Sequence, residues 1–193
     1  MPDVIASFSR LYVYAVMPIL IVITLCSHEL ADILLGSAFR EGSGIIPILV
    51  FGMMVRGFSM YGHKGLELAE RTHVMFVLVA ISAAFNVVLN LIFVPIYGYT
   101  AAAVTTVAGY VLYPILVHRA SRSHVPWRVP WRAIAAALSA GLVSMAAGAL
   151  VRRAMPGQHP LPVIAAAGAT ALAVYSVAVF LMLRIPALRE ASR

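Results

Sequence analysis

The fold is decided by Val74–Val94, VMFVLVAISAAFNVVLNLIFV, and Ala101–Val117, AAAVTTVAGYVLYPILV, two apolar runs that only PIYGYT at residues 95–100 separates. Each run is close to the ~20 residues that a helix needs to cross the hydrocarbon core of a bilayer. Pro95 and Gly98 break helices, so the sequence predicts a tight turn at Pro95–Gly98 between two membrane-spanning helices.

Four further apolar runs of similar length flank this pair. They are Phe8–Cys26, Ile45–Leu68, Ala133–Val151 and Pro162–Leu183. With 62% hydrophobic and 11% charged residues, the chain has too little polar surface for a water-soluble domain. The sequence therefore predicts an all-α, polytopic membrane helical bundle with six transmembrane helices, forming a single transmembrane domain over residues 1–193.

The basic residues between the six runs are sorted onto alternate sides of the predicted bundle. The side of the N-terminus holds ten of them: Arg10, Lys64, Arg71, Arg119, Arg122, Arg128, Arg132, Arg184, Arg189 and Arg193. The opposite side holds three: Arg40, Arg152 and Arg153. By the positive-inside rule, both termini lie in the cytoplasm and the protein resides in the cytoplasmic (inner) membrane. The net charge of +7 is explained by helix ends that face anionic headgroups of membrane lipids, so we expect no nucleic-acid partner.

A polar stripe runs along the Ile45–Leu68 segment. On a helical wheel its members fall within an arc of about 80°, and they are Arg56, Ser59, His63, Glu67 and Glu70. An unpaired guanidinium at the middle of a span costs at least ~2.5–3.5 kcal/mol, so intramembrane arginines usually serve a function. Arg56 is interpreted either as the cationic lining of a hydrated pathway for an anionic substrate, or as one half of an ion pair with a carboxylate on another helix. Glu67 and Arg71 are expected to form an ordinary i,i+4 surface pair.

A second polar face lies on the Val74–Val94 segment, where Ser82, Asn86 and Asn90 follow one another at i, i+4 and i+8. Side-chain amides in a span usually hold neighbouring helices together, at ~0.6–2 kcal/mol each, although contact with a substrate is the alternative. In the next segment Ala101, Thr105 and Gly109 form a face of small residues for close helix approach.

Two connections carry recognisable patterns. Residues 27–36, SHELADILLG, predict a short amphipathic helix on the outer membrane face, followed by a glycine-rich turn through Gly42 and Gly44. Val-Pro-Trp-Arg occurs twice in tandem, at residues 125–128 and 129–132. Tryptophan beside arginine is typical of an anchor at the headgroup level, which Trp127 and Trp131 are predicted to supply, with docking of a partner protein as the alternative.

The sequence offers little for catalysis or for a metal. The acidic residues total seven and all lie near predicted helix ends or in loops. His28, Glu29 and Asp32 lack the second histidine of a zinc-binding helix, and the single cysteine, Cys26, permits neither an intramolecular disulfide nor a cysteine-based cluster. We therefore expect no enzyme activity, no metal and no cofactor.

Three stretches together resemble the polysaccharide flippases of the multidrug/oligosaccharidyl-lipid/polysaccharide exporter superfamily. They are ILLGSAF at residues 33–39, GLELAERT at residues 65–72 and NVVLNLIFVPIYGYTAAAVTT at residues 86–106. The last is similar to the family's asparagine-rich helix, its Pro-x-Tyr-Gly turn and its small-residue helix. Thr100 stands where the family commonly has a glycine, which is a departure. The resemblance covers residues 8–122 by pattern and the last two spans by hydropathy.

The resemblance implies a transporter that moves lipid-pyrophosphate-linked oligosaccharides from the cytoplasmic to the outer leaflet through a cationic cavity between two helical lobes. The candidate substrate-binding residues are Arg56, Ser59, His63, Asn86 and Asn90, with Arg56 as the contact to substrate phosphate. Only the last six helices of such a flippase are matched, and alternating access requires two bundles that move against each other. The chain is therefore expected to be a truncated product, or to assemble with a missing N-terminal lobe.

Two other functions remain open from the sequence. One is a membrane scaffold without transport activity, which would co-purify with polysaccharide-assembly proteins. The other is a fragment of a cation-coupled drug exporter, which ranks last because such exporters usually need carboxylates within their spans.

Overall fold

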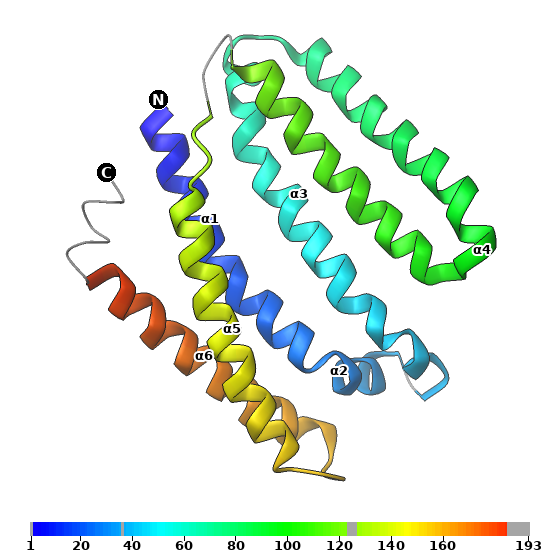
Figure 1. The fold of residues 1–193 in the computed structure, drawn as a ribbon, viewed down its shortest axis with the longest axis vertical. Helices are drawn as coiled ribbons and strands as arrows, with labels where there is room; N and C mark the ends of the chain where they lie inside the picture. Colours follow the sequence, from blue (N-terminus) through cyan, green and yellow to red (C-terminus); the bar gives the residue numbers. More distant parts are fainter. Residues whose placement is uncertain (1, 36, 123–126, 185–193) are drawn as a thin grey trace. The chain divides into compact units, whose positions relative to one another are not determined.

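The structure, a computed structural model, describes residues 2–35, 37–122 and 127–184 (Figure 1). These residues form helices and no strand, so the predicted all-α class is confirmed for the described chain. The helices are α1 (Pro2–Leu25), α2 (Ser27–Leu34), the 3-10 helix η1 (Ser37–Gly44), α3 (Ile45–Leu68), α4 (Thr72–Ser121), α5 (Trp131–Arg153) and α6 (Pro160–Arg184). The predictions that involve Gly36, residues 123–126, Arg189 and Arg193 fall outside the described residues.

Five of the described helices are long and apolar enough to cross a membrane, and one of them accounts for two predicted spans. The 50 residues of α4 would measure about 75 Å as one straight helix, against a hydrocarbon core of about 30 Å. Instead α4 reverses at Gly98, and Figure 1 shows its two green arms side by side. The six predicted runs thus lie in helices, except that Cys26 at the end of the first run follows α1, which ends at Leu25.

The reversal in α4 is narrower than the predicted turn over Pro95–Gly98. Pro95, Ile96 and Tyr97 remain helical, and Gly98 alone leaves the helix, with φ 65° and ψ −150°. A side chain would make this backbone conformation strongly unfavourable, because it belongs to a region that essentially only glycine occupies. One glycine therefore makes the turn that the sequence assigns to four residues.

The chain divides into two compact units, which are described separately. The first comprises residues 1–9 and 48–129, and the second comprises residues 10–47 and 130–193. The division runs through α1 and α3, each of which begins in one unit and continues in the other. The prediction of a single transmembrane domain stays a prediction.

Small residues form the buried face of α5, which packs beside α6 and against α1 in the second unit (Figure 1). A Cβ atom added to Gly148 would lie 3.0 Å from the carbonyl oxygen of Ala167, and one added to Gly141 would lie 3.3 Å from Cδ1 of Ile21. Backbones this close are typical of membrane helices, whose association depends on van der Waals packing. In addition the Tyr175 hydroxyl donates a hydrogen bond to the Tyr14 carbonyl over 3.2 Å.

The amphipathic helix predicted after the first span is confirmed as α2, but the glycine-rich turn after it is wrong, because Ser37–Gly44 forms the 3-10 helix η1. Glu29 and His28 of α2 contact other elements of the second unit. The Arg152 Nε donates to Glu29 Oε1 over 2.8 Å, and His28 Nδ1 lies 2.6 Å from the Ser43 hydroxyl. Within the residues that the structure describes, no group of three metal-ligating side chains comes together.

Cys26, directly after α1, provides a test of this packing. Its thiol is fully buried, and burial, followed by the nearby Glu29 carboxylate, raises the pKa of the thiol above its ordinary value. Because the thiolate is the reactive form, we expect a water-soluble maleimide at neutral pH to label the folded protein roughly tenfold or more slowly than the denatured protein. A Cys26→Ala/His159→Cys variant, with its thiol in an exposed loop position, should label rapidly in both states. Equal rates for Cys26 in the folded and denatured protein would contradict its burial.

Candidate functional site

The polar stripe of α3 lies against the second arm of α4, residues 99–121, within the first unit. Gly52 makes this approach possible, because a Cβ atom there would lie 2.8 Å from Cγ2 of Val107 and 3.1 Å from Cδ2 of Tyr110. Close packing at Gly52 brings the next turn of α3, which carries Arg56, alongside the aromatic residues of α4.

Arg56 places its guanidinium over the ring of Tyr110, with 5.3 Å between Cζ and the ring centroid. No carboxylate of the described chain pairs with it, and its side chain is exposed on the surface of the unit. A cation over an aromatic face gains ~0.5–2 kcal/mol, which offsets part of the cost of a charge in the membrane. Of the two interpretations from the sequence, an ion pair with a carboxylate is not found in the part that the structure describes.

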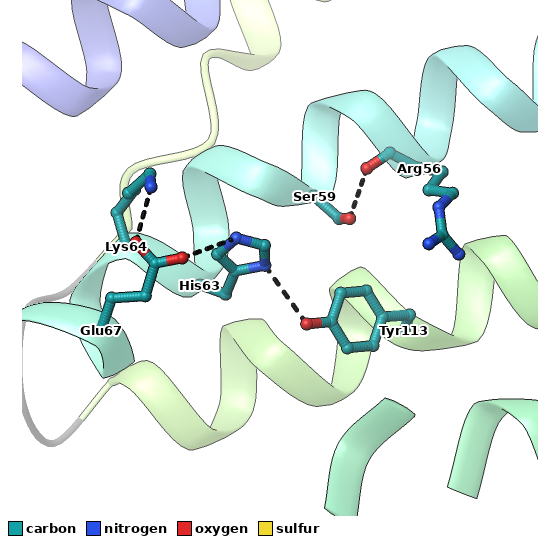
Figure 2. A network of polar contacts seen from close by, with 6 residues as sticks. All are labelled: Arg56, Ser59, His63, Lys64, Glu67 and Tyr113. Carbon is teal, nitrogen blue, oxygen red and sulfur yellow. Dashed lines mark hydrogen bonds and ion pairs between the residues drawn. The ribbon is translucent and has the colours of Figure 1, made fainter. Parts of the chain in front are cut away.

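Ser59 is oriented differently from what a substrate contact requires. It is buried, and its hydroxyl donates a hydrogen bond of 2.5 Å to the backbone carbonyl of Arg56, one turn earlier (Figure 2). Serines in membrane helices often satisfy their hydroxyl in this way. Arg56 and His63 are therefore the members of the stripe that extend toward α4.

Both ring nitrogens of His63 have partners, and the contact of Nδ1 joins α3 to α4 (Figure 2). Nδ1 lies 3.2 Å from the hydroxyl of Tyr113 on α4, and Nε2 lies 3.2 Å from Oε1 of Glu67, one turn further along α3. The other carboxylate oxygen of Glu67 accepts a 2.5 Å hydrogen bond from Lys64 Nζ. The sequence missed this network because His63 and Tyr113 are far apart in the chain. The predicted Glu67–Arg71 pair is wrong, since Glu67 is occupied by His63 and Lys64.

Glu70 does not belong to the stripe, because α3 ends at Leu68. Glu70 takes a left-handed conformation with φ 55°, its amide donates to the carbonyl of Glu67, and the amide of Arg71 donates to the carbonyl of Leu66. These are the two hydrogen bonds of a Schellman ending, in which glycine usually holds the left-handed position. The prediction that Glu70 continues the helical stripe was wrong, because a glutamate, unlike a glycine, does not indicate that a helix ends at this position.

Asn86 and Asn90 lie on the first arm of α4 and face its second arm. The Thr105 hydroxyl donates to Oδ1 of Asn90 over 3.0 Å, and Nδ2 of Asn90 donates to Oδ1 of Asn86 over 3.1 Å. Gly109 lies opposite Asn86, where a Cβ atom would be 3.2 Å from the asparagine Cβ. The predicted close packing of the Ala101, Thr105 and Gly109 face is confirmed, and these asparagines hold the hairpin together.

The structure does not bring the five candidate residues together in one group. Arg56 and His63 contact Tyr110 and Tyr113, whereas the two asparagines contact Thr105 and Gly109. At 100° per residue, Thr105 and Tyr110 point about 140° away from each other around the helix axis, although Gly109 and Tyr113 are neighbours at i,i+4. Two tyrosines one turn apart in an apolar run could have indicated the Arg56 side of the site, because a buried tyrosine hydroxyl needs a polar partner.

Loss of the Asn90 side chain should weaken the α4 hairpin. We expect Asn90→Leu to lower the stability of the purified protein toward thermal unfolding in detergent by ~1 kcal/mol, the size of an interhelical hydrogen bond in a membrane protein. Val88→Leu, an apolar change at an exposed position two residues away, is the matched control and should leave stability unchanged. Equal stability of the two variants would show that the Thr105–Asn90 hydrogen bond does not hold the arms together.

Trp127 is an internal packing residue, so its predicted role as a headgroup anchor is wrong. Its side chain is 5% exposed, its ring centroid lies 4.9 Å from that of Phe58, and its Nε1 donates to the Ser9 hydroxyl over 3.3 Å. Its ring also lies directly against Gly62. Trp131 is 72% exposed, so its role as an anchor stays a prediction.

Long apolar helices and a polar stripe packed between two of them define a polytopic α-helical membrane protein. Comparison with known proteins agrees with this class. An uncharacterized membrane protein of Methanocaldococcus jannaschii, MJ1068, is 30% identical over 95 residues, which are 49% of this chain and 19% of that protein. The matched part is thus about a fifth of the length of this relative. No family model and no solved structure matches the chain.

Proposed function

We propose that this chain is part of a flippase that translocates lipid-pyrophosphate-linked oligosaccharides across the cytoplasmic membrane, with both of its termini in the cytoplasm. The observation that carries the proposal is Arg56, a charged residue in the middle of an apolar helix that contacts an aromatic ring and no carboxylate of the described chain.

The chemistry of Arg56 and Tyr110 suits the headgroup of such a lipid. A guanidinium presents a planar fork of N–H donors that matches two phosphate oxygens, and it does so better than an ammonium group. An arriving pyrophosphate would neutralise a charge that the lipid bilayer cannot solvate. The aromatic ring of Tyr110 keeps the guanidinium oriented, and the N–H groups of the guanidinium stay available for phosphate oxygens.

The resemblance in residues 33–39, 65–72 and 86–106 supports the same function. The third of these stretches spans the reversal of the α4 hairpin, and the second arm continues beyond it to Tyr110 and Tyr113. An anionic lipid headgroup would meet Arg56 on the side of α3 that packs against this arm.

Depletion of the protein in the cells that make it separates a flippase from an assembly scaffold. Without the flippase, completed lipid-linked oligosaccharides should accumulate, because synthesis continues while translocation stops. Without a scaffold, the same intermediates should decrease, because their synthesis is impaired. Extraction of the lipid fraction and mass spectrometry of the lipid-linked sugars distinguishes the two, and a decrease would overturn the proposal.

A further inference from the structure

We propose that His63, Tyr113 and Glu67 form a proton-binding site, and that its proton supplies a second positive charge to the Arg56 site when a pyrophosphate group binds. This inference rests on the proposed function, since it takes the anionic headgroup as the ligand of Arg56. It adds that headgroup binding and proton uptake are linked.

The hydrogen bonds of His63 are suited to both protonation states. In the neutral ring, Nε2–H donates to the Glu67 carboxylate and Nδ1 accepts from the Tyr113 hydroxyl. In the protonated ring, Nδ1–H donates to the same hydroxyl oxygen, which requires only that the hydroxyl hydrogen rotates away. A tyrosine hydroxyl can donate or accept, and a carboxylate accepts in either case. Both ring nitrogens of His63 therefore keep a hydrogen-bond partner in either protonation state.

Protonation of His63 changes the net charge of the groups around it. The charged and titratable groups that face it within the described chain are Glu67 and Lys64 on α3 and Tyr113 on α4. Lys64 and Glu67 compensate each other, so the network is neutral with a neutral imidazole and carries one positive charge with a protonated one. The histidine side chain is 14% exposed, which keeps this charge from being screened as it would be in water.

The charge on His63 lies on the same face of α3 as Arg56, so it acts on a pyrophosphate bound at Arg56 through its electric field and not by direct contact. Arg56 and His63 are seven residues apart on one face of α3, which corresponds to about 10 Å along the helix axis. Figure 2 shows both side chains directed toward the second arm of α4. With His63 protonated, the stripe offers two positive charges to a pyrophosphate, and with His63 neutral it offers one.

Binding of polyprenyl pyrophosphate N-acetylglucosamine to the full chain in lipid nanodiscs tests the proposal. The pyrophosphate of this probe is esterified at both ends, so its own charge stays constant from mildly acidic to mildly alkaline pH. We expect the wild-type chain to bind about tenfold more tightly at mildly acidic than at mildly alkaline pH, a usual size for coupling between two sites. The sign follows from protonation, which adds the second charge below the pH at which His63 titrates.

Three variants separate the proton site from the anion site. His63→Gln should bind with the weaker, alkaline affinity at both pH values. His73→Gln, an exposed histidine in the same unit, is the matched control and should behave as wild type. Glu67→Gln removes the carboxylate that stabilises the protonated imidazole of His63, so the pH at which binding strengthens should move downward. Each purified variant must elute as the wild type does in size-exclusion chromatography.

The outcomes distinguish this inference from the proposed function. If His63→Gln keeps the pH dependence of the wild type, the inference is wrong. If the wild type binds equally at both pH values and Arg56→Gln removes binding, the inference is wrong while the proposed function is supported. If the wild type does not bind the probe at either pH, both fail.

Discussion

Arg56→Gln should reduce the delivery of oligosaccharide to the cell surface by roughly 10–100-fold, the effect expected from losing hydrogen bonds between charged groups. The protein should stay in the membrane at its wild-type level, because the exposed Arg56 side chain lies over the Tyr110 ring and forms no ion pair with a carboxylate of the described residues. Glutamine retains hydrogen-bonding capacity and much of the length of the side chain, so the charge is the main change. Surface polysaccharide and membrane-bound protein should be measured together in the complete protein.

Two further substitutions separate the shape of the guanidinium from its charge. Arg56→Lys keeps the charge but loses the planar fork, so we expect an intermediate defect. Tyr110→Phe keeps the aromatic face and should act as wild type, which makes it the control for disturbance of the α3–α4 contact. Normal surface polysaccharide in Arg56→Gln would remove Arg56 from the mechanism.

Gly62→Leu should destabilise the first unit by ~3–5 kcal/mol, comparable to the loss of a buried tryptophan. A Cβ atom at Gly62 would lie 2.6 Å from Cε3 of Trp127, so the larger side chain must expel the indole ring. The ring would then lose its contacts with Phe58 and with the Ser9 hydroxyl. Unfolding of the purified protein by titration with a denaturing detergent should show the loss as an earlier transition.

A double-mutant cycle identifies Trp127 as the cause. Trp127→Ala alone should be destabilising, and Gly62→Leu should cost much less in the Trp127→Ala background because the clash is gone. Gly44→Ala, where a Cβ atom meets nothing within 4 Å, is the control for replacing a glycine. If the two destabilisations add without interaction, Gly62 does not act through the tryptophan.

Hydropathy predicts most of the fold, because the thickness of the bilayer determines how long an apolar run must be to cross it as a helix. The helical period also placed Arg56, Ser59 and His63 on one side of α3. Neither property specifies partners distant in sequence, and so the contact of His63 with Tyr113 could not be predicted. Helix packing alone determines it.

A tryptophan beside an arginine is a sequence pattern that does not distinguish a headgroup anchor from an internal packing residue. The same dipeptide suits a headgroup anchor and a helix-packing wedge, and the choice depends on whether a cavity exists for the ring. At Trp127 the cavity is made by Gly62, which lies more than sixty residues earlier in the chain. In the tandem copy Trp131 is exposed.

A role in translocation is tested most directly by the leaflet in which the lipid-linked oligosaccharide resides. Right-side-out membrane vesicles should be prepared from cells with the wild-type protein, with the Arg56→Gln variant and without the protein, and probed with a lectin that cannot cross the membrane. We expect the lectin to bind the lipid-linked sugar only in the wild-type vesicles, and lysis to expose the sugar in the other two preparations. Equal binding to all three intact preparations would contradict a role for this chain in translocation.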